Sequence, residues 1–111
     1  MKVYLSGPIT GVKDHAARFA MAEKYFADRG HKVENPEKLG GLLEELHGAQ
    51  PGALPWADYM REDIKALVDC DAIAMLPGWN ESRGARLERQ VADALGLIEA
   101  RVPHFLYGEE S

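Results

Sequence analysis

Two short segments far apart in the chain each follow an apolar, strand-like run, and each leads into a predicted helix. The first is residues 4–11, Tyr-Leu-Ser-Gly-Pro-Ile-Thr-Gly, and the second is residues 82–88, Ser-Arg-Gly-Ala-Arg-Leu-Glu. In an open α/β sheet, ligands bind outside the carboxyl ends of the strands, where free backbone N–H groups and helix N-termini attract anions. The two segments therefore predict one shared ligand site, and a phosphate-bearing small molecule is its first candidate ligand.

Glu88 is an acidic residue that a helix cap does not explain. It lies six residues after Ser82, the predicted N-cap of the last long helix, whereas the glutamate of a capping box lies three residues after the cap. Its spacing from Gly84 puts it on the inward apolar face of that helix. A catalytic carboxylate and a buried salt bridge both explain such a position. The arginines that could form the salt bridge are Arg61, Arg83 and Arg86.

The other polar candidates divide into solvated and ligand-binding positions. Asp63 is a lone acid on a predicted helix, and we favour a solvated position for it. Arg83 stands in a glycine-containing loop at a helix start, where a guanidinium group suits a phosphate. The four histidines show no spacing typical of metal ligands, and the first loop lacks the dinucleotide and P-loop fingerprints. No metal and no cofactor is therefore expected.

The composition limits the classes of partner. The 111 residues predict one domain, residues 1–111, and the formal charge of −5 argues against a polymeric nucleic acid as ligand. A single cysteine, Cys70, excludes an intrachain disulfide. The chain shows neither a leader pattern nor an apolar run of membrane-spanning length, so a cytoplasmic protein without a membrane partner is expected.

Strand-like and helix-like segments alternate along the chain, which predicts a parallel sheet covered by helices on both faces. We expect a single-domain three-layer α/β/α architecture with a flavodoxin-like parallel sheet of four or five strands. The predicted elements are a strand at 2–6, a helix at 14–30, a strand at 31–34, a glycine-rich excursion with one short helix at 37–55, a helix at 55–70, a buried strand at 71–76, a helix with apolar positions at Leu87, Val91, Leu95 and Ile98, and a closing strand at 103–107.

Three motifs carry a family resemblance. They are Tyr-x-Ser-Gly-Pro-x-Thr-Gly at 4–11, Asp-x-x-x-Leu-x-x-Cys-Asp at 63–71 and Ser-x-Gly-x-x-x-Glu at 82–88. Together they resemble the nucleoside 2-deoxyribosyltransferase superfamily, and within it a small branch common in phage and prophage proteomes. The resemblance implies a flavodoxin-like fold in which Glu88 attacks the anomeric carbon of a sugar, Asp63 assists at the base or the sugar, and Tyr4 positions the carboxylate.

One departure from the superfamily pattern points to the substrate. Transferases of free nucleosides carry an aspartate six residues before the nucleophile, whereas this chain has Ser82, as in the branch that hydrolyses deoxynucleoside 5′-monophosphates. The expected reaction is therefore N-glycosidic cleavage of a (deoxy)nucleoside 5′-monophosphate. A deoxyribosyltransferase and a non-catalytic nucleotide-binding module are the alternatives. The predicted substrate-binding residues are Ser6, Gly7, Pro8, Thr10, Gly11, Trp79, Ser82, Arg83 and Gly84.

The short chain also suggests an assembly. A pocket at the edge of so small a sheet is open to water on one side, and aromatic residues that could cover it, Trp56, Tyr59 and Trp79, lie in or beside the predicted loops. Members of the resembled superfamily form dimers that complete each other's sites. We therefore expect a symmetric homodimer in which Trp79, Tyr59 or the segment 42–55 reaches the neighbouring pocket.

Overall fold

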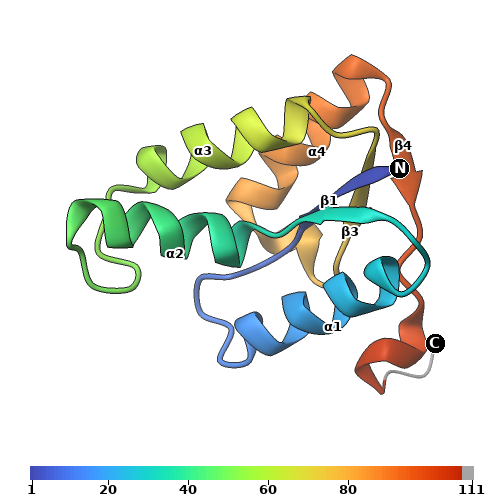
Figure 1. Cartoon of the computed structure of the whole chain (residues 1–111), viewed down its shortest axis with the longest axis horizontal. Coiled ribbons are helices and arrows are strands. Elements are labelled where there is room, and N and C mark those ends of the chain that lie inside the picture. Colours follow the sequence, from blue (N-terminus) through green and yellow to red (C-terminus); the bar gives the residue numbers. More distant parts are fainter. Residues whose placement is uncertain (109–111) are drawn as a thin grey trace.

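The computed structural model describes residues 1–108, so the last three residues of the predicted domain lie outside the described part. Its layers confirm the predicted α/β/α fold: α1 covers one face of the sheet, and α3 and α4 cover the other (Figure 1). The helices and strands are β1 (Lys2–Ser6), α1 (His15–Ala27), β2 (Lys32–Glu34), α2 (Pro36–His47), α3 (Trp56–Val68), β3 (Ala72–Met75), the 3₁₀ turn η1 (Trp79–Glu81), α4 (Arg83–Leu95), β4 (Ile98–Ala100) and the 3₁₀ turn η2 (His104–Tyr107).

The strand order places the ends of β1 and β3 side by side. All pairs in the sheet are parallel and the order is β2-β1-β3-β4, so β1 and β3 are the inner strands. Ser6 at the end of β1 is in register with Met75 at the end of β3. The chain leaves β1 toward β2 and returns to β3 on the other side, which makes this point the topological switch where ligands of such sheets bind.

The inner strands are buried on both faces because their side chains alternate between two apolar clusters. Val3 and Leu5 of β1 pack toward α1, whereas Tyr4 packs toward α3 and α4. Every residue of β3 is buried, as its unbroken apolar sequence predicts. This alternation also turns Ser6 to the same face as Tyr4, the face that α4 covers.

The end of the chain differs from the prediction. The last strand is Ile98–Ala100, paired with β3, and the predicted strand at 103–107 is a 3₁₀ turn instead. Gly96 has a φ of 71° and ends α4 there, so Ile98 starts the strand rather than continuing the helix. Leu95, expected on the inward face, is 55% exposed in this last turn.

The glycine-rich excursion also differs from the prediction. In place of one short helix, the twelve residues Pro36–His47 form α2, which packs against α3. Asn35 caps it by accepting a hydrogen bond from the amide of Glu37 at 2.9 Å, and Gly48, with a φ of 60°, ends it. Within the described residues, no helix combines the length and the apolar character needed to cross a membrane.

Gly7 is required where β1 leaves the sheet, which gives a first prediction. A Cβ atom on Gly7 would lie 2.7 Å from the Cβ of Leu76, too close for either backbone to keep its place. We expect Gly7→Ala to lower the free energy of unfolding by about 1–3 kcal/mol in urea titrations. Gly41→Ala is the matched control, because a Cβ on this helical glycine meets nothing within 4 Å, and it should raise stability by about 0.5–1 kcal/mol. Equal effects of the two variants would contradict this account.

Candidate active site

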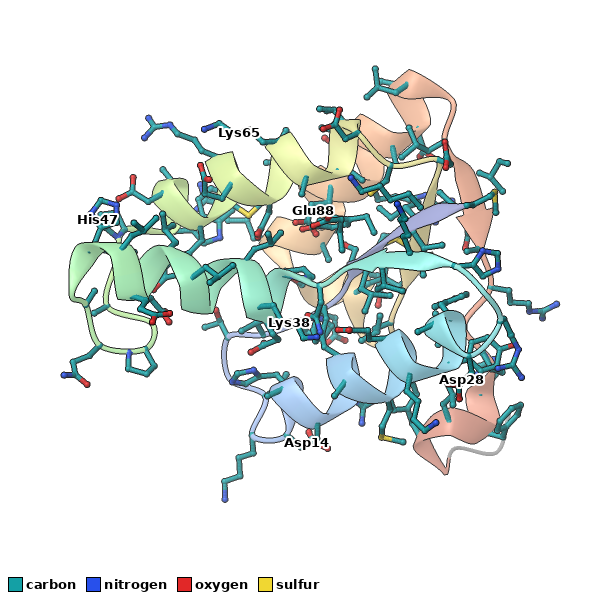
Figure 2. All side chains as sticks on the ribbon, viewed as in Figure 1. Asp14, Asp28, Lys38, His47, Lys65 and Glu88 are labelled. Carbon is teal, nitrogen blue, oxygen red and sulfur yellow. The ribbon has the colours of Figure 1, made fainter. Side chains whose placement is uncertain are left out.

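Glu88 lies in the interior of the molecule, between the helices and the sheet (Figure 2). Two hydroxyl groups hold its carboxylate there. Tyr4 donates a hydrogen bond to its Oε2 and Ser6 donates one to its Oε1, each at 2.6 Å. The Glu88 residue is 4% exposed, and Tyr4 and Ser6 are fully buried. Since β1 is an inner strand and α4 packs on it, both donors are fixed by the main architecture. A hydrogen bond therefore holds each oxygen of the carboxylate, and one of the two comes from Tyr4, which was predicted to position this group.

The alternative prediction, that Glu88 forms a buried salt bridge, is wrong. Within residues 1–108 no lysine or arginine forms an ion pair with this carboxylate. Of the arginines considered, Arg61 pairs with Asp58 at 3.3 Å and the guanidinium of Arg83 lies 3.8 Å from the centre of the Trp56 ring. Neutral hydroxyl donors hold the Glu88 carboxylate instead, so its charge is not cancelled by a cation.

Asp63 is buried beside this carboxylate, which corrects the solvated position that we favoured from the sequence. The residue is 7% exposed and lies on the α3 face that packs toward the sheet. A single helical acid gives no sign of its partner, and here the neighbour is Glu88, 25 positions further along the chain. No hydrogen bond from another residue of the described chain reaches the Asp63 carboxyl group.

The two buried acids have different pKa values. It raises the pKa of Asp63 to about 8, and the charge of Glu88 adds to that rise. Burial also raises the pKa of Glu88 to about 7, but the hydrogen bonds from Ser6 and Tyr4 favour its ionised form. Burial raises the pKa of Tyr4 well above its usual range, so its hydroxyl stays a donor. Glu88 therefore loses its proton first as pH rises, and between about pH 7 and about pH 8 the favoured state of the pair has an ionised Glu88 and a protonated Asp63.

A cleft of about 1290 Å³ opens above this pair, and both acids line it. Its volume exceeds that of many small-molecule sites. The predicted binding residues in its wall are Gly7, Pro8, Thr10, Gly11, Ser82, Arg83 and Gly84. Ser6 does not line the cleft but lies beneath it, hydrogen-bonded to Glu88. Trp79 is half-buried against the apolar cluster that contains Tyr4, and it lies outside the cleft of its own chain.

The N-terminus of α4 forms one end of the cleft. Ser82 caps this helix, accepting a hydrogen bond from the amide of Ala85 at 3.2 Å, as predicted. The first helical bond runs from the amide of Arg86 to the carbonyl of Ser82 at 2.9 Å, so the amides of Arg83 and Gly84 precede the hydrogen-bonded ladder. With the Arg83 guanidinium stacked on Trp56, this end of the cleft carries backbone N–H donors and a positive charge.

The wall of the cleft opposite the α4 end comes from α2, and its residues were not predicted from the sequence. Glu37, Gly40, Gly41 and Glu44 line the cleft from one face of this helix. Their spacing of three and four residues is the signal that could have found them, once Asn35-Pro36 is taken as a helix start. Within the described residues, no three histidine, cysteine or acidic side chains gather closely enough to hold a metal ion.

Comparison with known proteins gives a family and no function. None of the curated proteins matches the chain. The family described as "Domain of unknown function (DUF4406)" matches residues 1–99, a range that contains β1, α2, α3 and α4 and with them every wall of the cleft. Because this match covers most of the chain, the protein belongs to the DUF4406 family of domains of unknown function.

Proposed function

We propose that the protein cleaves the N-glycosidic bond of a (deoxy)nucleoside 5′-monophosphate. The observation that carries the proposal is the buried, uncancelled carboxylate of Glu88, held on both oxygens by Tyr4 and Ser6 beside a second acid that keeps its proton. Glycosidic cleavage needs this pair: an anion to stabilise or trap an oxocarbenium-like centre, and a neutral acid for the leaving group.

In the proposed reaction Glu88 forms and then breaks a bond to the sugar, and Asp63 gives up one proton and then regains one. The ionised Glu88 forms a bond from its carboxylate oxygen to C1′ as the C1′–N bond breaks, and the bonding electrons leave with the base. Asp63 gives its proton to the departing base and becomes an anion. Water then attacks C1′, its proton passes to Asp63, and Glu88 leaves as a carboxylate, so that the free base and the sugar phosphate are the products.

The cleft end at α4 supports a 5′-phosphate on the substrate. The free amides of Arg83 and Gly84 and the Arg83 guanidinium supply donors and positive charge, and the loop after β1 supplies a further part of the cleft wall. This end lies one to two helical turns before Glu88 on the same helix, which suits a sugar placed between phosphate and nucleophile. The homodimer and the cytoplasmic location stay predictions.

The direct test is incubation with a panel of nucleoside and deoxynucleoside monophosphates, with chromatographic detection of free base. Release of base from at least one of them supports the proposal. A second, free base added to the reaction separates the alternatives, because a transferase makes a new nucleotide and a hydrolase does not. Tight binding without any base release would identify a nucleotide-binding module instead and would overturn the proposed catalysis.

Ser82 offers a prediction on the phosphate. Ser82→Asp keeps an oxygen that can cap α4, but it places a negative charge at the anion end of the cleft. We expect the variant to fold as the wild type does, to lose at least tenfold in kcat/KM for monophosphates (about 1.4 kcal/mol), and to lose much less for nucleosides. The readout is base release from a monophosphate and its matching nucleoside. Equal losses for the two substrates would remove the phosphate from this end.

A further inference from the structure

The α2 face that lines the cleft carries two successive glycines between two glutamates. Glu37, Gly40, Gly41 and Glu44 share this face. Glycine inside a helix weakens it relative to alanine, so two together need a reason. Packing does not supply one. A Cβ on Gly40 would make ordinary contact with the Tyr59 ring at 3.5 Å, and a Cβ on Gly41 would meet nothing within 4 Å. The glycines therefore leave a bare strip of helix backbone facing the cleft.

Asp63 is a second and independent sign of a ligand at this strip. The residue is only 7% exposed and lines the cleft, yet within residues 1–108 no hydrogen bond reaches its carboxyl group. No fully enclosed polar side-chain atom of the described residues lacks a partner, so the Asp63 oxygens keep an opening to the cleft. A buried carboxyl group with this opening calls for a partner that the ligand supplies.

Glu44 presents a fixed acceptor at the far end of the strip. Its Oε2 accepts hydrogen bonds from the Tyr59 hydroxyl at 2.6 Å and from the amide of Gly52 at 2.7 Å. These bonds lower the pKa of Glu44, so it stays ionised. Among the described residues, no group donates to its Oε1. The carboxylate is thus immobilised by one oxygen and offers the other as an acceptor for an N–H group of a ligand.

We propose, resting on the proposed function, that the Gly40–Gly41 strip is the base subsite and that Glu44 selects bases with an exocyclic amino group. A planar ring fits against bare helix backbone where a side chain would block it. Asp63 meets the ring near the glycosidic bond as a donor, and Glu44 accepts from the amino group at the ring's far edge. A keto oxygen in that place would face the Glu44 carboxylate without a hydrogen between them, and binding would weaken.

The test compares substrates that differ by this one group. Deoxycytidine and deoxyuridine 5′-monophosphates form one pair, and the adenine and hypoxanthine deoxynucleotides form the other. We expect the wild type to prefer the amino member by roughly tenfold or more in kcat/KM. Glu44→Gln keeps an oxygen for Tyr59 and Gly52 but puts an N–H donor in place of the free acceptor, so the preference should reverse. Glu45→Gln is the control, because Glu45 is exposed and does not line the cleft.

Gly41→Leu tests the strip itself. Its side chain projects into open space, so the fold should survive, and we expect at least a tenfold rise in KM for both nucleotide pairs with unchanged binding of deoxyribose 5-phosphate by calorimetry. Equal use of amino and keto substrates, or a wild-type KM in Gly41→Leu, would overturn the base subsite while base release continued to support the proposed function. A wild type that neither binds nor cleaves any nucleotide would overturn both.

Discussion

Glu88→Gln should lower base release at least about 100-fold, or about 2.7 kcal/mol of activation barrier, without unfolding the protein. The amide has the shape of the carboxylate, and its oxygen can still accept from Tyr4 or Ser6, whose hydroxyl groups rotate to suit. It supplies no negative charge to the anomeric carbon. The measurement is the single-turnover rate of base release under saturating enzyme, so that a change in substrate affinity is separated from a change in chemistry.

The control for Glu88→Gln is Glu81→Gln. Glu81 also lines the cleft, but it is exposed on η1 and outside the contact with Tyr4 and Ser6. Its rate should stay within a few-fold of the wild type. A loss below tenfold in Glu88→Gln would exclude a nucleophilic role, and urea unfolding of both variants shows whether lost activity follows lost fold.

The architecture could be predicted because its signals are local. The helical spacing of Phe19, Ala22 and Phe26 placed α1, and the unbroken apolar run of β3 placed an inner strand. Glu88 could be placed inward because its own helix carries the pattern. The error at the C-terminus has a local cause too: Ile98 continues the helical spacing of Leu95, and only the left-handed Gly96 between them stops the helix.

The site needed information that no single segment contains. Asp63 has the sequence surroundings of a solvated helical acid, and its burial follows from the packing of α3 against α4 and the sheet. The contact of Ser6 with Glu88 joins residues 82 positions apart. For α2, glycines at 40 and 41 argued against a long helix on propensity, whereas the Asn35 cap and packing on α3 outweigh their cost.

The raised pKa values of Asp63 and Glu88 make stability depend on pH in a defined direction. In the folded chain these acids hold protons up to about pH 8 and about pH 7, whereas an unfolded chain releases them near pH 4. Between these limits the folded state binds more protons than the unfolded state, so the free energy of unfolding falls as pH rises. Each such proton contributes at most about 1.4 kcal/mol per pH unit.

Asp63→Asn should therefore stabilise the protein at alkaline pH while it damages catalysis. The asparagine side chain does not titrate, so the variant lacks the larger of the two proton-linked contributions to stability. We therefore expect its stability to depend less on pH. At pH 8 its free energy of unfolding should exceed that of the wild type by an amount on the order of a few kcal/mol. In the pH profile of base release, the wild type should rise as Glu88 ionises near 7 and fall as Asp63 loses its proton near 8. The variant should lose the alkaline limb and retain a low rate.

The measurements for Asp63→Asn are urea unfolding at pH 5, 7 and 9 and base release over the same range. Asp69→Asn is the matched control, because Asp69 is exposed just after the same helix and should leave both profiles as in the wild type. Opposite signs for stability and activity distinguish a functional acid from a structural one, since a residue needed for folding would lose both. A wild type whose stability does not fall between pH 5 and pH 9 would show that the buried pair is not protonated as described, and the acid assigned to the leaving base would then have to come from elsewhere.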